Sequence, residues 1–276
     1  MKCGIVDVGS NTIRLSIYQW EGQQFKLLMN KKEMAGLAGY IREGVLSDAG
    51  VQAAGRVLTG FQTLLDNFDI SQVHVFGTAS LRNIVNTEEV LSALKRETGL
   101  TVEVLTGAEE ATFSFLGATV GGCAPASGLL ADIGGGSTEL VHYENGTIRS
   151  GDSIPVGSLS LYTQYVSGLF PTKGERWDIR IRVEEELERV EPSPARCTHL
   201  TGVGGTIRAA AKLCNDLAGL DPSNRRIPAG EIHALYKSLK KGDQATLRQI
   251  LRTVPDRVHT ILPGLVILHR VLKRYK

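Results

Sequence analysis

Two glycine-rich turns next to carboxylates hold the residues whose types and spacing best fit a chemical role. In the longer turn, at residues 129–141, an apolar run ends at Asp132, three consecutive glycines follow, and a second apolar run starts at Thr138. Because glycine lacks a Cβ atom, successive N–H groups in such a turn can line a concavity that binds phosphate oxygens. A tight hairpin that needs the glycines only for positive φ is the alternative. The phosphate-binding candidates are Gly134, Gly135, Gly136, Ser137 and Thr138.

Two acids bracket this turn and change the chemistry expected of it. Asp132 precedes the glycines and Glu139 follows them. Carboxylates next to a bound phosphate repel it unless a hard cation such as Mg²⁺ lies between them. We therefore predict that Asp132 and Glu139 are ligands of Mg²⁺ or another divalent cation.

A second turn with the same order of residue types stands near the N-terminus. Residues 5–18 run from an apolar segment through Asp7 to a turn of Gly9, Ser10 and Asn11, and then into another apolar segment. Two such strand–turn–strand units, roughly half a chain apart, predict two similar domains that face one phosphate site. This arrangement resembles the actin-like superfamily, which includes sugar kinases and heat-shock chaperone ATPases.

Two helix starts are the next elements that must position functional side chains. After an apolar strand at residues 73–76, residues 77–83 turn into a helix and place Arg82 in its first turn. The helix dipole does not favour a cation there, which points to an anion as the partner of Arg82. An ordinary ion pair with a nearby carboxylate explains the placement equally well.

The second helix start, at residues 106–111, contains two adjacent acids with different predicted roles. Thr106 and Glu109 match a capping box, so Glu109 has a structural role at the helix start. Glu110 points to a different face of the helix. A carboxylate fixed on a rigid helix start suits a general base for a water molecule. A solvated acid is the alternative interpretation of Glu110 taken alone.

A third glycine-rich segment, at residues 201–211, runs from a strand into an alanine-rich helix whose first N–H groups are open to an anion. Its candidate residues are Gly204, Gly205 and Thr206. Ile207 stands where a dinucleotide fingerprint needs its third glycine, and the chain has no Gly-Lys-Ser/Thr phosphate loop. The segment therefore predicts an anion site that is neither of these nucleotide motifs.

Composition indicates an ordinary folded chain of two domains. Of the 276 residues 42% are hydrophobic and 22% charged, and a small-residue segment broken by proline sets predicted domains at 1–120 and 121–276. A net charge of +2 leaves polyanion binding to local basic clusters. The four cysteines are scattered, and no signal peptide or membrane-spanning run is evident. We therefore expect a cytoplasmic protein without nucleic-acid or membrane partners.

Five segments in order resemble the signatures of the exopolyphosphatase and guanosine pentaphosphate phosphohydrolase (Ppx/GppA) family. The resemblance implies an α/β fold of two actin-like (ribonuclease H-like) domains, with mixed sheets flanked by helices and an interdomain cleft that binds the terminal phosphate of a chain. It also implies that Glu110 acts on the attacking water. The segments are residues 7–15, 77–86, 106–117, 132–141 and 201–211. The implied phosphate ligands are Gly9, Ser10, Asn11, Arg82 and the loop from Gly134 to Thr138, and the implied metal ligands are Asp132 and Glu139, with Asp7 as a third group.

Three features depart from the family pattern. Asn83 follows Arg82 where an acidic residue is usual, and Arg257-Val258-His259 stands in place of an Arg-Ala-Asp segment. The chain also ends soon afterwards, before the last segment that many short members return to the first domain and without the helical extension of the long members. We therefore expect a weaker grip on very long polyphosphate.

The leading hypothesis is a Mg²⁺-dependent exopolyphosphatase that removes the terminal phosphate from inorganic polyphosphate by in-line attack of water. The nearest alternative keeps this chemistry and hydrolyses the 5′-phosphate of guanosine pentaphosphate (pppGpp). A kinase or chaperone-like ATPase and a non-catalytic polyphosphate or nucleotide sensor are the alternatives from other classes. The expected partners are polyphosphate or (p)ppGpp, and the apolar run at residues 261–268 suggests a homodimer.

Overall fold

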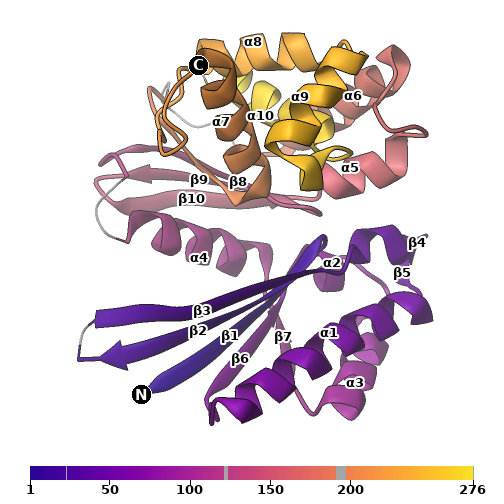
Figure 1. The fold of residues 1–276 in the computed structure, drawn as a ribbon, viewed down its shortest axis with the longest axis vertical. Helices are drawn as coiled ribbons and strands as arrows, with labels where there is room; N and C mark the ends of the chain where they lie inside the picture. Colours follow the sequence, from indigo (N-terminus) through magenta and orange to yellow (C-terminus); the bar gives the residue numbers. More distant parts are fainter. Residues whose placement is uncertain (23, 121–123, 191–196, 276) are drawn as a thin grey trace. The chain divides into compact units, whose positions relative to one another are not determined.

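The computed structural model describes residues 1–22, 24–120, 124–190 and 197–275. Packing within the chain separates two compact units, Met1–Thr106 and Gly107–Lys276 (Figure 1). The candidate site residues are divided between them.

The first unit is a mixed α/β domain. Its elements are β1 (Lys2–Val8), β2 (Thr12–Glu21), β3 (Gln24–Met34), η1 (Leu37–Tyr40), β4 (Ile41–Arg42), β5 (Val45–Leu46), α1 (Asp48–Asn67), β6 (Val73–Gly77), α2 (Ala79–Arg82), α3 (Thr87–Thr98) and β7 (Val102–Val104). The main sheet has the order β3-β2-β1-β6-β7, with an antiparallel meander of β1, β2 and β3 and with β6 and β7 parallel to β1. Leu58, Phe61 and Leu65 recur at helical spacing on α1 and share one core with Val6 and Leu15 of the sheet.

The second unit is also mixed α/β and carries more helices. Its elements are α4 (Gly107–Thr119), β8 (Gly128–Ile133), β9 (Thr138–Glu144), β10 (Thr147–Ile154), α5 (Ser158–Tyr165), α6 (Lys173–Arg189), β11 (Leu200–Val203), α7 (Gly204–Ala218), α8 (Ala229–Leu239), α9 (Gln244–Thr253), η2 (Pro255–Arg257) and α10 (Ile261–Arg274). The sheet has the order β10-β9-β8-β11. α4 lies on one face of this sheet and the later helices lie on the other (Figure 1). Ala111 and Phe115 of α4 form a small core with Leu130, Val141 and Tyr143.

The two sheets repeat one topology. In each, three consecutive strands form an antiparallel meander and a later strand pairs in parallel with the first of them, which gives β3-β2-β1-β6 and β10-β9-β8-β11. The predicted fold class, two α/β domains of the actin-like type with mixed sheets flanked by helices, is confirmed. In both units the first hairpin of the sheet contains one of the predicted glycine turns.

The boundary between the units has a direct consequence for the site. The sequence predicted a domain boundary between residues 120 and 121, whereas the boundary between the compact units lies between Thr106 and Gly107. The reason is that α4 packs on β9 and β10, with Ala111 and Phe115 in the core of that face. Glu110 on α4 therefore belongs to the same unit as Asp132 and Glu139.

The apolar run at residues 261–268, which suggested a homodimer, forms the buried start of α10. Each of these eight residues is buried, and α10 packs against α5, α6, α7 and α8. The run is thus explained by the core of the second unit, and a homodimer stays a prediction without this support. No helix in the described part of the chain combines the length and apolarity needed to cross a bilayer.

Candidate active site

Asp132 and Glu139 are direct cross-strand partners on β8 and β9. Glu139 is 1% exposed and Asp132 is half-buried. Burial raises the pKa of Asp132, and burial together with the charges of Glu110 and Asp132 raises the pKa of Glu139 to about 8. Like charges directly opposite each other in a sheet are destabilising. The pair therefore has the electrostatics of a cation site.

Three serine hydroxyls hold the two carboxylates in place. Ser114 on α4 donates to Asp132 Oδ2 at 2.6 Å. Ser137 and Ser153 both donate to Glu139 Oε1, at 2.7 and 2.8 Å. Hydrogen bonds from O–H to an ionised carboxylate are among the stronger ones in proteins, and these fix the orientation of both acids. Ser114 and Ser153 were not among the residues that the sequence singled out.

The glycine turn at residues 134–137 is held from one side by the start of α5. Gly134 N donates to Ser137 O at 3.0 Å, and the carbonyls of Gly134 and Gly135 accept hydrogen bonds of 2.9 Å from backbone N–H groups at the start of α5. No cis peptide bond occurs among the described residues, so each N–H points opposite to the carbonyl of its own peptide unit. The amides of Gly135 and Gly136 consequently point away from α5, as a phosphate-binding turn requires.

The hydroxyl groups that the sequence assigned to phosphate are used within the protein. The Ser137 hydroxyl donates to Glu139, and the fully buried Thr138 hydroxyl donates to a backbone carbonyl just before α5, at 2.7 Å. Thr206, in the first turn of α7, is buried at a close approach of α10. A phosphate contact by Ser137 or Thr138 would thus use backbone N–H groups, and the phosphate role of all three residues stays a prediction.

The N-terminus of α7 lies against Asp132. Gly204 has a φ of 93°, and a Cβ atom at this position would lie 2.7 Å from Asp132 Oδ1, so glycine is required. A Cβ atom on Gly205 would overlap the guanidinium group of Arg257, which places that arginine at the same helix start. Because the positive end of the helix dipole disfavours a cation, Arg257 and the first N–H groups of α7 together favour an anion.

Glu110 occupies the first turn of α4, on the side of the carboxylate pair. It is half-buried, whereas the adjacent Glu109 is exposed. The charge of Glu110 is the largest electrostatic contribution, after burial, to the raised pKa of Glu139. The second unit thus gathers Glu110, Asp132, Glu139, the 134–138 turn and the start of α7 in one region.

The first unit contains a second cluster of predicted phosphate ligands. Gly9 begins a tight turn between β1 and β2, and Ser10 and Asn11 are buried in it. Among the described residues, the Asn11 Nδ2 donor has no hydrogen-bond partner, and neither has the buried hydroxyl of Ser80 just after β6. The backbone after β6 donates to Val8 at the end of β1, which joins the two loops. Buried donors without partners are costly, so this pattern favours an anion as the missing acceptor.

Arg82 and Asp7 lie in the same unit as this second cluster. Arg82 Nη1 donates to the Leu105 carbonyl at 2.9 Å. α2 has only four residues and ends at Arg82, so the argument from the helix dipole does not apply to this arginine, and its phosphate role stays a prediction. Asp7 is exposed and has Arg14 as its cross-strand partner. The prediction that the two clusters contact one phosphate stays a prediction.

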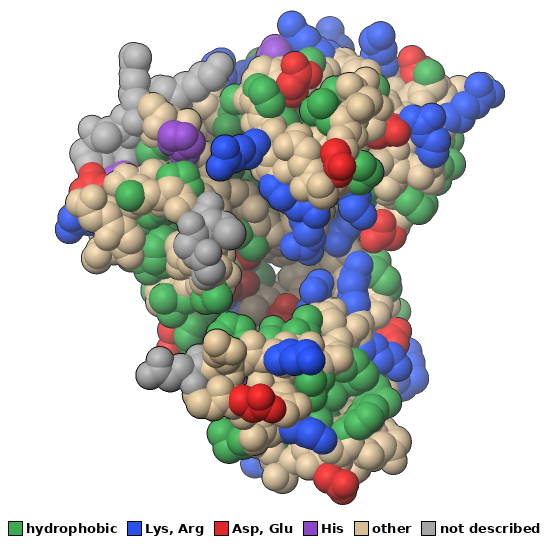
Figure 2. All heavy atoms as spheres, turned by 60° about the vertical axis from the view of Figure 1, so that its left-hand side comes forward, with side chains coloured by type: hydrophobic (Ala, Val, Ile, Leu, Met, Phe, Trp, Pro, Cys, Tyr) green, Lys and Arg blue, Asp and Glu red, His purple; other side chains and the backbone are tan. Residues whose placement is uncertain are grey.

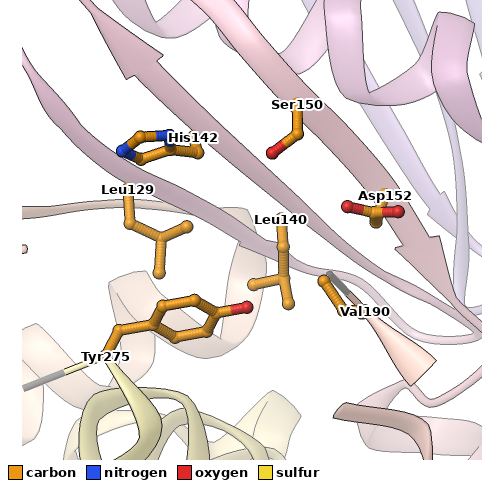
Figure 3. Close-up of a pocket in the computed structure, with 7 residues that line it drawn as sticks. All are labelled: Leu129, Leu140, His142, Ser150, Asp152, Val190 and Tyr275. Atoms are coloured by element: carbon orange, nitrogen blue, oxygen red, sulfur yellow. The ribbon is translucent and has the colours of Figure 1, made fainter. Parts of the chain in front are cut away.

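A small cavity lies on the opposite face of the second sheet. Leu129, Leu140, His142, Ser150, Asp152, Val190 and Tyr275 line it (Figure 3). Side chains alternate between the two faces of a strand, so Leu140 and His142 point away from the face that carries Glu139. This cavity is therefore separate from the carboxylate pair.

The repeated α/β units, each with a glycine turn next to a carboxylate, define the class: a two-domain α/β protein of the actin-like type. The model of the Ppx/GppA phosphatase family matches residues 16–276. The chain belongs to the Ppx/GppA phosphatase family. This confirms the resemblance inferred from the five sequence segments and the prediction of an enzyme of the phosphohydrolase class.

Individual relatives are similar at moderate identity. A Haemophilus influenzae protein named putative exopolyphosphatase is 28% identical over 273 residues, which cover 96% of this chain and 82% of that protein. A Photobacterium profundum protein named guanosine-5′-triphosphate,3′-diphosphate pyrophosphatase is 28% identical over 214 residues, which cover 75% of this chain but 42% of that protein. This chain therefore matches less than half of the second relative.

Solved structures match along the whole chain. The Aquifex aeolicus member of the Ppx/GppA family is 27% identical, with a TM-score of 0.78 over 100% of this chain and 90% of that one. An exopolyphosphatase from Cytophaga hutchinsonii is 23% identical, with a TM-score of 0.84 over 100% and 91% of the two chains, and it shows the shared fold.

Proposed function

We propose that this chain is an exopolyphosphatase that uses a divalent cation, with Mg²⁺ the expected one, to remove the terminal phosphate from inorganic polyphosphate. The observation that carries the proposal is the group of Glu110, Asp132 and Glu139 beside a glycine turn and a helix N-terminus in the second unit. The named activity of the Haemophilus influenzae relative supports the choice of substrate.

The donor set fits a magnesium ion. Within the described residues no group of three or more His, Cys, Asp or Glu side chains is arranged to hold a metal. Mg²⁺ commonly uses one or two carboxylates and completes its octahedron with water and substrate phosphate oxygens. Asp132 and Glu139 would supply the two carboxylates, and Asp7 would be a third group from the first unit. The bound cation would neutralise charge that develops on the transferred phosphoryl group.

Glu110 suits the role of general base for the attacking water. Its carboxylate is half-buried at the rigid start of α4, close enough to Glu139 to influence its pKa. A water molecule positioned by Glu110 would give up its proton to this carboxylate as it attacks the terminal phosphorus in line with the leaving oxygen.

The chain offers several groups that would hold the phosphate during this attack. In the second unit these are the amides of Gly135 and Gly136, the first N–H groups of α7, and Arg257. Asn11 and Arg82 of the first unit were assigned to this phosphate from the sequence, and that assignment stays a prediction. Donors placed before the reaction stabilise the equatorial oxygens without reorganisation during the step. Figure 2 shows Lys and Arg side chains gathered over parts of the second unit, although the net charge is only +2.

A second candidate substrate is pppGpp, which the name of the Photobacterium profundum relative favours. Phosphate release should be compared for polyphosphates of several lengths and for pppGpp, with Mg²⁺ present and with the cation chelated. We expect faster release from polyphosphate and none without the cation. A preference for pppGpp would make pppGpp the substrate in place of polyphosphate. Tight binding without phosphate release would indicate a non-catalytic sensor instead of an enzyme. Phosphate transfer from ATP to a sugar would favour a kinase.

A further inference from the structure

The helix that carries Glu110 also contacts the carboxylate pair through Ser114. The Ser114 hydroxyl donates to Asp132 Oδ2 at 2.6 Å. Ser114 follows Glu110 by four residues, so the two side chains lie on one face of α4, a single turn apart. Asp132 and Glu139 are opposite each other on the adjoining strands. One helix face thus meets both predicted metal ligands.

We propose that Ser114 is a positioning residue that ties the Asp132 carboxylate to α4 and so fixes the spacing between Glu110 and the metal-binding carboxylates. The inference rests on the proposed function. The hydroxyl would not touch the substrate, and it would act through the orientation of Asp132.

The surroundings of Asp132 show why its carboxylate needs a hydrogen bond to keep its orientation. Oδ1 faces the start of α7, where a Cβ atom on Gly204 would come within 2.7 Å of it, and Oδ2 accepts the Ser114 hydrogen bond. Rotation about the last bond of an aspartate side chain meets only broad, shallow barriers. When both acids are ionised, repulsion from Glu139 directly opposite favours rotation of the Asp132 carboxylate away from the proposed metal site. The hydroxyl of Ser114 opposes that rotation.

The two acids differ in how many hydroxyls hold them. Glu139 Oε1 accepts from both Ser137 and Ser153, so loss of one donor leaves the other. Within the described part of the chain, Ser114 is the one hydroxyl that donates to Asp132, and the charge of Arg208 also acts on this acid. Removing the Ser114 hydroxyl should therefore affect the cation site more than removing either serine at Glu139.

The test compares Ser114→Thr with Ser114→Val. The two new side chains have nearly the same shape, but only threonine keeps a hydroxyl group. The matched control is Thr112→Val, because the Thr112 hydroxyl on the same helix donates to the backbone carbonyl of Ala108 instead of to a carboxylate. Mn²⁺ affinity is titrated by electron paramagnetic resonance without substrate, and kcat and KM are measured with polyphosphate. Unfolding in urea with the cation chelated reports any general loss of stability.

We expect Ser114→Val to weaken Mn²⁺ binding and to lower kcat, each about tenfold or more, as the loss of hydrogen-bond partners of metal ligands commonly does. Ser114→Thr should stay close to the wild type in both, and Thr112→Val should change neither. KM for polyphosphate should move little, because Ser114 does not contact the substrate. If Ser114→Val does not fold, Ser114→Ala takes its place in the comparison.

The outcomes separate this inference from the proposed function. Equal Mn²⁺ affinity and equal kcat in Ser114→Val and Ser114→Thr, in a wild type that binds the ion and releases phosphate, would overturn the inference and leave the function standing. Lower stability with unchanged affinity would show a merely structural role and would also overturn it. A wild type that neither binds Mn²⁺ nor releases phosphate would refute the proposed function, and the inference with it.

Discussion

Replacing Glu139 by Gln isolates the contribution of the carboxylate pair to the pH dependence of stability. Burial and the charges of Glu110 and Asp132 raise the pKa of Glu139 from 4.5 to about 8 in the folded, metal-free protein. The unfolded chain therefore releases a proton that the folded chain keeps, and stability falls as the pH rises from 4.5 to about 8. At about 1.36 kcal/mol per pH unit, the loss has an upper bound of about 5 kcal/mol.

The glutamine variant removes the titrating proton and keeps the local hydrogen bonds. Its Oε1 can still accept from Ser137 and Ser153, which both donate to this atom in Glu139. We expect Glu139→Gln to match the wild type at about pH 5 and to be more stable by a few kcal/mol at about pH 8, with the cation chelated. The remaining slope should come from Asp132, whose pKa burial also raises.

Urea unfolding across this pH range, with and without excess Mg²⁺, measures the effect. Mg²⁺ should stabilise the wild type most at the alkaline end, because a cation favours the ionised carboxylates, and it should stabilise Glu139→Gln less. Glu144→Gln is the control, since Glu144 is half-buried at the end of the same strand and pairs with Arg149. Parallel stability profiles for the wild type and Glu139→Gln would refute the electrostatic account of this site.

Three further predictions concern other parts of the chain. Gly204→Ala should lower the free energy of unfolding by about 2 kcal/mol or more, because of the positive φ and the overlap of a Cβ atom with Asp132. Gly60→Ala, in open space on α1, should raise the free energy of unfolding by about 0.5–1 kcal/mol. Equal urea midpoints for the two variants would contradict this prediction. Glu110→Gln should keep the fold and polyphosphate binding but lose about a hundredfold or more in kcat, measured by phosphate release; full turnover would discard its role as base. Burial, His233 and nearby cations lower the pKa of His269 to about 4, so the melting temperature should fall as the pH drops from 6.5 to about 4; His269→Gln should flatten that fall, and an identical slope would exclude His269 as its source.

The parts that could be predicted from the sequence depend on short-range patterns. An apolar run followed by glycines and another apolar run predicts strand, turn and strand, and it does so in both units. The adjacency of Asp132 and Glu139 follows from the same tight turn, since a hairpin brings the residues on either side of it together. Such inferences need no knowledge of the rest of the fold.

The site residues that the sequence did not predict are brought to the site by contacts between distant segments of the chain. Ser153 reaches Glu139 because β10 pairs with β9 in a register that places the two residues opposite each other, and sequence alone does not give this register. Arg257 reaches the start of α7 from a segment some fifty residues further along the chain. Ser114 carried one usable signal, its spacing of four residues from Glu110 on a predicted helix.

The two units place an aspartate at equivalent positions but surround it with opposite charges. Asp7 and Asp132 are each the residue before the last in the first strand of their sheets. The cross-strand partner of Asp7 is Arg14, whereas that of Asp132 is Glu139. The first pair carries its own opposite charge, whereas the second places two carboxyl groups opposite each other, and the charge of Arg208 acts on Asp132 as well. We therefore expect the proposed divalent cation to depend on the carboxylate pair of the second unit, so replacing Asp132 or Glu139 should weaken Mn²⁺ binding more than replacing Asp7.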